Sequence, residues 1–142
     1  MPITPHLVVA GAQAAAAFYE AAFAAREIDR IPTPDGRLMS VQLALADGLL
    51  HIADEFPEFG VLGPRSIGGT PVVLSLDVPD ADAAFARAVA AGALVRQPVQ
   101  EMFWGARHGQ LEDPFGHRWN VEQHVRDVAH EEVVAAAAAM FG

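Results

Sequence analysis

The sequence contains no cysteine, and this absence excludes both disulfide bonds and metal sites built from thiolates. It also lacks any apolar run near the roughly 20 residues that a membrane-spanning helix requires. The first residues, MPITPHLVV, do not combine a basic region with a long apolar stretch, so we expect no signal peptide. These absences predict a cytoplasmic protein without a membrane partner.

Basic residues are scarce, with 9 lysines and arginines against 18 aspartates and glutamates. The formal net charge of −9 argues against nucleic acid as a partner, because phosphate binding requires a basic surface. The chain also contains no GxSxG, P-loop or dinucleotide-binding fingerprint. We therefore expect a small molecule as the main partner.

Apolar residues make up 52% of the 142 residues, which is enough for a buried core. The predicted elements follow the order β-α-β-β-β, and the same order then returns. Strands are expected at 3–9, 27–31, 38–45 and 49–53 with a helix at 12–25, and again at 72–78, 94–99, 102–112 and 117–124 with a helix ending at Ala91. The chain is interpreted as one domain with module one at 1–54, a linker at 55–70, module two at 71–124 and a tail at 125–142.

The two halves also align in sequence. With a shift of 67 positions, residues 4–18 lie over residues 71–85. With a shift of 69, residues 50–52 lie over residues 119–121, and we attribute the difference to a two-residue insertion in a loop.

Capping residues define the predicted helix ends. Asp80 or Asp82 can cap the start of the second helix, and Gly92 follows its end, where a left-handed residue is expected. A third helix is predicted from Asp127 to Met140, and we expect it to pack on the body or on a second subunit.

The stretch EDPFGHRWNVE predicts a turn followed by a strand. Asp113, Pro114 and Gly116 occupy the first, second and fourth positions of a four-residue turn. In the strand that follows, Trp119 and Val121 are expected on one face, because strand side chains alternate. The opposite face then carries Arg118, Asn120 and Glu122.

Motifs spread over nearly the whole chain carry a resemblance to a known family. They are Pro5 with Leu7-Val8-Val9, Phe18-Tyr19 with Phe23, residues 34–37, 53–55 and 91–93, Trp104-Gly105 with Arg107, and residues 113–119. With them the chain resembles the vicinal oxygen chelate superfamily, which includes glyoxalase I, extradiol dioxygenases and bleomycin-resistance proteins, and within it the PhnB-like, glyoxalase-like branch. The resemblance implies an α+β fold of two tandem β-α-β-β-β modules whose curved mixed sheets enclose a cleft, plus a C-terminal helix.

The resemblance also identifies where metal-dependent members hold their metal. Those positions correspond here to Thr4, His51, Pro71 and Asn120. Only His51 is a good ligand, so no metal cofactor is expected. The alternative is nickel, zinc, iron or manganese held by His51 with His6 and Glu122. In this set His6 and Glu122 each lie two residues beyond the family positions Thr4 and Asn120, whereas His51 is at its family position. A shift of two residues moves a side chain about 7 Å along a strand, so the three residues are awkwardly placed to share one ion. We therefore prefer the interpretation that they form the polar lining of a cleft.

The candidate ligand-binding residues are His6, His51, Ser75, Trp104, Arg107, Asn120 and Glu122. No catalytic residue is assigned. Trp104 and Arg107 suit a flat or anionic ligand. The alternative for this pair is that Trp104 packs the rim while Arg107 pairs with Glu112 or Asp113. His108, His124 and His130 are expected to be exposed.

Two functions follow from this interpretation. The first is a small-molecule binder that sequesters a natural product or metabolite without metal chemistry, as bleomycin-resistance proteins do. The second is a metal-dependent lyase, isomerase or dioxygenase with an unusual ligand set around His51. In either case we expect a homodimer, possibly one whose halves are exchanged between subunits.

Overall fold

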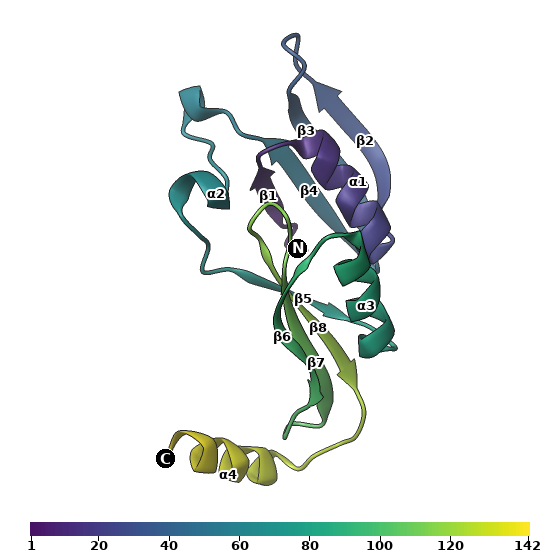
Figure 1. Cartoon of the computed structure of the whole chain (residues 1–142), viewed down its shortest axis with the longest axis vertical. Helices are drawn as coiled ribbons and strands as arrows, with labels where there is room; N and C mark the ends of the chain where they lie inside the picture. The colour runs from purple at the N-terminus through teal and green to yellow at the C-terminus, as the bar shows by residue number, and fades with distance from the viewer.

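Two four-stranded mixed sheets form the body of the protein, and each sheet carries one helix on one of its faces (Figure 1). The computed structural model describes residues 1–142. The first half consists of β1 (His6–Val9), α1 (Ala12–Phe23), β2 (Arg26–Pro32), β3 (Leu38–Leu45) and β4 (Gly48–Asp54). Its sheet has the strand order β1-β4-β3-β2, with β1 parallel to β4.

The second half repeats this arrangement. It consists of β5 (Val73–Asp77), α3 (Ala81–Ala91), β6 (Leu94–Glu101), β7 (Ala106–Glu112) and β8 (Arg118–His124), in the sheet order β5-β8-β7-β6. The linker holds two short helices, η1 (Pro57–Phe59) and α2 (Pro64–Ile67), and the tail forms α4 (His130–Phe141). The predicted α+β fold of two β-α-β-β-β modules with a C-terminal helix is confirmed.

The repeat has the same offset in the first strand, the helix and the last strand of each half. His6 pairs with His51 in the first sheet, and Ser75 pairs with Asn120 in the second, so equivalent residues are 69 positions apart in both strands. The two helices also begin 69 positions apart, at Ala12 and Ala81. The shift of 67 predicted for residues 4–18 is therefore wrong. The alanine-rich helices misled the alignment, because two runs of alanine match almost equally well when one is displaced by two residues.

Equivalent side chains bind the starts of both helices. Asp54 accepts a hydrogen bond of 2.7 Å from the Ala12 amide and another of 2.7 Å from the Leu38 amide. In the second half, Gln123 accepts one of 2.9 Å from the Ala81 amide. Both side chains satisfy a backbone donor that the first turn of a helix leaves without a partner.

The predicted caps of α3 are confirmed, whereas the predicted start of α4 is wrong. Asp80 is the N-cap residue and accepts a hydrogen bond of 3.0 Å from the Ala83 amide, and Gly92 follows the helix with φ 121°. The last helix begins only at His130, and its N-cap residue is Ala129 rather than Asp127.

Helix α4 lies apart from both sheets. None of its residues is buried, and Figure 1 shows it projecting beyond the end of β8. The segment that leads to it is fixed, because the Val125 and Arg126 amides donate to the Gly105 carbonyl at 2.9 and 3.1 Å. Gly105 has φ +92°, and a Cβ there would lie 2.2 Å from the Arg126 carbonyl oxygen, so only glycine fits.

The core lies between the helices and the sheets, and it is continuous across the two halves. In the first half, the small side chains of α1 let the helix approach Leu43, Leu50 and Ile52 closely, and these three residues are buried. Helices α1 and α3 also pack against each other (Figure 1). At their junction the Arg87 guanidinium donates to the Ala21 carbonyl at 2.8 Å and binds the carboxyl end of α1.

A hydrogen-bonded carboxylate connects the halves at the DPFG turn. Asp113 is fully buried and accepts hydrogen bonds from the Tyr19 hydroxyl at 2.5 Å and from the Trp119 indole at 2.9 Å. Its other oxygen accepts from the Phe115 and His117 amides at 2.9 and 3.0 Å. The turn chemistry predicted for Asp113 is thus present, and the same side chain also joins α1 to the second sheet.

Candidate functional site

The sheet faces opposite the helices carry most of the predicted site residues. In β4, Leu50 and Ile52 are buried under α1, so the alternation of the strand places His51 on the other face. His6 lies on the same face directly beside His51, and the centroids of the two rings are 4.4 Å apart. His6 is therefore not displaced along the sheet from His51, contrary to our expectation.

Hydrogen bonding and burial define the state of His51. Its Nε2 lies 2.9 Å from the Gln42 side-chain amide nitrogen, which can only donate, so the imidazole accepts there and is neutral. Burial lowers the pKa of His51, and the nearby charge of His6 lowers it further. His51 is thus an uncharged hydrogen-bonding group at neutral pH.

The equivalent face of the second sheet carries an amide and a hydroxyl in place of the two imidazoles. Asn120 donates a hydrogen bond of 3.2 Å from its Nδ2 to the Ser75 hydroxyl. Its Oδ1 atom is buried and accepts no hydrogen bond. A buried acceptor without a donor is costly, so an N–H or O–H group that reached this oxygen would be stabilised there.

A second polar cluster follows along β7 and β8. The Trp104 indole donates a hydrogen bond of 2.9 Å to Glu122, and His108 Nδ1 lies 3.3 Å from the same carboxylate oxygen. His108 is only 9% exposed, so the prediction of an exposed histidine is wrong. Alternation within the predicted strand 102–112 could have revealed it, because His108 lies on the face that carries Glu122.

The structure does not bring Arg107 to this face. Its guanidinium binds Asp82 of α3 at 2.9 and 3.0 Å, on the side of the sheet that the helix covers. The expected pairing with Glu112 or Asp113 is also not observed. Burial of the neighbouring His108 on the opposite face explains this position, because adjacent side chains of a strand point in opposite directions.

The residues at the family's metal positions do not fit a metal ion held by one chain. Pro71 offers no side-chain donor, and Asn120 offers only an amide. No group of three or more histidine, aspartate and glutamate side chains is close enough to share an ion. His6 and His51 belong to the first sheet and Glu122 to the second, so the alternative set is not assembled within one chain either.

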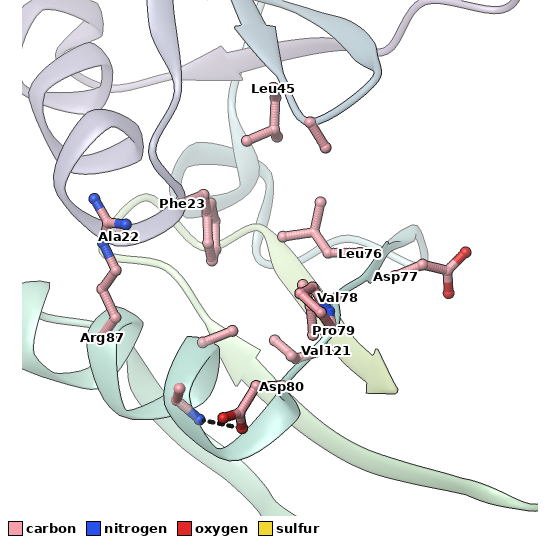
Figure 2. A pocket seen from close by; sticks show the side chains of 13 residues that line it. Ala22, Phe23, Leu45, Leu76, Asp77, Val78, Pro79, Asp80, Arg87 and Val121 are labelled. Carbon is pink, nitrogen blue, oxygen red and sulfur yellow. Dashed lines mark hydrogen bonds between the residues drawn. The ribbon is translucent and has the colours of Figure 1, made fainter. Parts of the chain in front are cut away.

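The main apolar pocket lies elsewhere, on the helix side of the junction between the halves (Figure 2). It has a volume of about 300 Å³ and lies between the end of α1, the β3–β4 turn and the start of α3. Figure 2 shows Phe23, Leu76 and Val121 around it. It contains none of the predicted site residues and offers few hydrogen-bonding groups, so we do not assign the function to it.

Comparisons with known proteins agree with this fold. A family model described as the Glyoxalase/Bleomycin resistance protein/Dioxygenase superfamily matches residues 3–121. An uncharacterized protein of Mycobacterium tuberculosis is 42% identical over 137 residues, which is 94% of this chain and 81% of that protein. An uncharacterized protein of Mycobacterium bovis is also 42% identical over 137 residues, which is 94% of this chain and 90% of that protein.

Solved structures share the same architecture. The crystal structure of TioX from Micromonospora sp. ML1 superimposes with a TM-score of 0.70 at 24% identity, over 88% of this chain and 99% of that one. The structure of a gene product from Arabidopsis thaliana gives a TM-score of 0.69 at 28% identity, over 85% of this chain and 97% of that one. At identities this low, the structural similarity supports the fold but not a shared activity.

No helix of the chain is both long and apolar enough to cross a membrane.

Proposed function

Since this chain belongs to the Glyoxalase/Bleomycin resistance protein/Dioxygenase superfamily, we propose that it binds a small molecule on its two polar sheet faces without metal chemistry. The binding residues in this proposal are His6 and His51 of the first sheet with Ser75, Trp104, Asn120 and Glu122 of the second. Arg107 is omitted, because it pairs with Asp82 on the opposite face.

The buried Asn120 Oδ1 is the observation that carries this proposal. It is the one buried side-chain nitrogen or oxygen in the chain without a hydrogen-bond partner. Native proteins satisfy almost all such atoms, and the exceptions need a reason. A ligand donor that reaches this oxygen would supply the missing hydrogen bond, and Glu122 on the same strand face would favour a ligand with a positive charge.

We further propose that the protein acts as a homodimer, with halves exchanged between subunits. None of the four main pockets of a single chain is lined by His51, Asn120 or Glu122, so one chain does not enclose these three residues in a pocket. A cleft would form where the first sheet of one subunit faces the second sheet of its partner. Helix α4 supports this arrangement, because an isolated helix of 12 residues is only marginally stable in water and needs a surface to pack on.

The second candidate is metal-assisted chemistry, and the paired rings of His6 and His51 favour it. Two imidazoles at a centroid distance of 4.4 Å could contribute two ligands to one ion. In an exchanged dimer, Glu122 of the partner subunit could supply a carboxylate. This candidate needs residues of two chains, whereas the binder needs no ion.

Elemental analysis separates the two candidates. The full chain would be purified without chelator, incubated with nickel, zinc, iron(II) or manganese, desalted and analysed by mass spectrometry. We expect no metal to be retained, and we expect cationic amines from a small-molecule library to raise the melting temperature. About one ion per subunit, lost in His51→Ala but kept in the control His124→Ala, would reject the metal-free binder.

A further inference from the structure

A polar pocket at the junction of α2 and the β7–β8 turn is not explained by the function proposed above. Its volume is about 340 Å³, and none of its nine lining residues is hydrophobic. Three of the nine are Arg65, Arg96 and Arg118, and Glu112 is the only acidic residue among them. Arg118 lies two residues before Asn120 on the same face of β8, so the pocket borders the polar face of the second sheet.

This concentration of positive charge is unusual for the chain. Its 9 basic residues are all arginines, and it has a formal net charge of −9. One third of the arginines line a single pocket, although acidic residues outnumber basic ones two to one in the chain. Like charges repel, so such a grouping favours an anionic partner that neutralises it.

The arginines keep donors available for such a partner. Arg96 forms an ion pair with Glu112, which neutralises one of the three charges. Arg65 donates from its Nε to the Pro114 carbonyl at 2.8 Å, which fixes the side chain and leaves both terminal nitrogens free. Arg118 takes part in none of the side-chain hydrogen bonds or ion pairs of the chain. Two guanidinium groups thus face one polar pocket without an acidic partner.

The backbone holds these two arginines in place. Arg118 begins β8, directly after the DPFG turn, and Arg65 lies in α2, which packs on that turn. The packing is close, because a Cβ on Gly116 would lie 2.9 Å from the Cβ of Pro64, and Gly116 has φ +94°. Glycine at this position therefore allows the linker to approach the second module and to present Arg65 beside Arg118.

We propose that this pocket binds a small oxyanion, a phosphate or carboxylate group, between Arg65 and Arg118. Guanidinium groups bind such anions through paired, charge-assisted hydrogen bonds. Thr70 and Arg118 also line a neighbouring pocket of about 220 Å³ that contains His6, so a larger anion has space to extend toward β1. The site needs neither the second subunit nor a metal ion.

Isothermal titration calorimetry with inorganic phosphate tests the proposal, with citrate as the carboxylate probe. The full chain is titrated at constant ionic strength, with chloride as the balancing ion. We expect saturable binding by the native protein. Arg118→Gln should weaken it about tenfold or more, because the substitution removes a charge-assisted contact. The control Arg126→Gln removes the same charge outside the pocket and should bind normally. No binding, or equal binding by Arg118→Gln, would overturn the proposal.

Limited trypsin digestion gives a second measurement that does not depend on a variant. Trypsin cuts after arginine, and Arg65 lies in the exposed linker. Phosphate should slow cleavage after Arg65, while cleavage after Arg126 should be unaffected. Equal rates in phosphate and in chloride would count against the site, even if the sheet faces were found to bind a ligand.

Discussion

The Tyr19 hydroxyl donates a 2.5 Å hydrogen bond to the buried Asp113 carboxylate, and this contact joins α1 of the first module to the turn between β7 and β8 of the second. Asp113 accepts three further hydrogen bonds, from Trp119, Phe115 and His117. Four donors from the two modules thus satisfy this one buried carboxylate.

Tyr19→Phe is expected to lower the free energy of unfolding by about 1–3 kcal/mol, because it removes one charge-assisted hydrogen bond and keeps the ring. Urea denaturation followed by circular dichroism measures the change. A matched control is Thr33→Val, which removes a surface hydroxyl bonded to Asp35 and to the Arg37 carbonyl and should cost about 0.5 kcal/mol or less. An equal effect of the two substitutions would contradict the role of Tyr19.

The same hydrogen bond predicts a loss of stability at alkaline pH. Burial raises the pKa of Tyr19 well above the ordinary value of 10.0, and the Asp113 charge raises it further. The folded state then holds this proton while the unfolded state loses it, so the contribution of Tyr19 to stability is constant below pH 10 and falls as the pH rises further. Melting temperatures between pH 8 and 11 should show a steeper fall for the native protein than for Tyr19→Phe. Parallel curves would refute this origin of the effect.

His51 should titrate below the ordinary histidine value of 6.5, because burial and His6 disfavour its charged form. Nuclear magnetic resonance of the imidazole nitrogens gives this pKa directly. In His6→Gln the pKa should rise, since the neighbouring positive charge is gone. The lowered pKa also means that His51 contributes stability above pH 6.5, which is lost as the pH falls through its folded-state pKa. An unchanged pKa in the variant would show that His6 exerts no influence.

Asn120→Ala should affect binding much more than folding. The substitution removes one hydrogen bond to Ser75 and also a buried acceptor without a partner, so we expect a loss of about 1 kcal/mol or less in stability. Ligands identified by thermal shift should bind about tenfold more weakly, because the acceptor is gone. The control Ser75→Ala breaks the same internal hydrogen bond and keeps Oδ1, so it should retain more affinity. The reverse order of affinities would rule out Oδ1 as the ligand acceptor.

Removal of residues 128–142 should weaken dimerisation and leave the body folded, because no residue of α4 is buried in the single chain. Sedimentation velocity over a range of concentrations measures the dimer dissociation constant. We expect it to rise, while the far-ultraviolet circular dichroism of the remaining chain keeps its sheet signal. An unchanged dissociation constant would show that α4 does not stabilise the proposed dimer.

Much of the fold could be predicted from local patterns. Trp119 and Val121 are buried on the helix side, at 2% and 0% exposure, while Asn120 lies on the opposite face, as alternation predicts. Asp80 and Gly92 mark the ends of α3 for reasons that act within a few residues. Such signals are strong because the backbone must satisfy its own hydrogen bonds wherever a helix or turn begins and ends.

Features that depend on distant partners were harder to predict. The pairing of His6 with His51 depends on how β1 slides along β4, and periodicity within one strand carries no information about that register. Arg107 was named as a candidate binding residue because its partner Asp82, 25 positions earlier, could not be identified from the sequence. Arg65 and Arg118 are 53 positions apart in the sequence and come together only because the linker folds back onto the turn.

The 69-residue repeat leaves the two polar faces unequal. Where one face presents the imidazoles of His6 and His51, the other presents the hydroxyl of Ser75 and the amide of Asn120 at the equivalent positions. A molecule held between two identical faces could bind in either of two orientations with equal energy. In the proposed cleft each end of the molecule would meet different chemistry, so an asymmetric ligand would bind in a single preferred orientation.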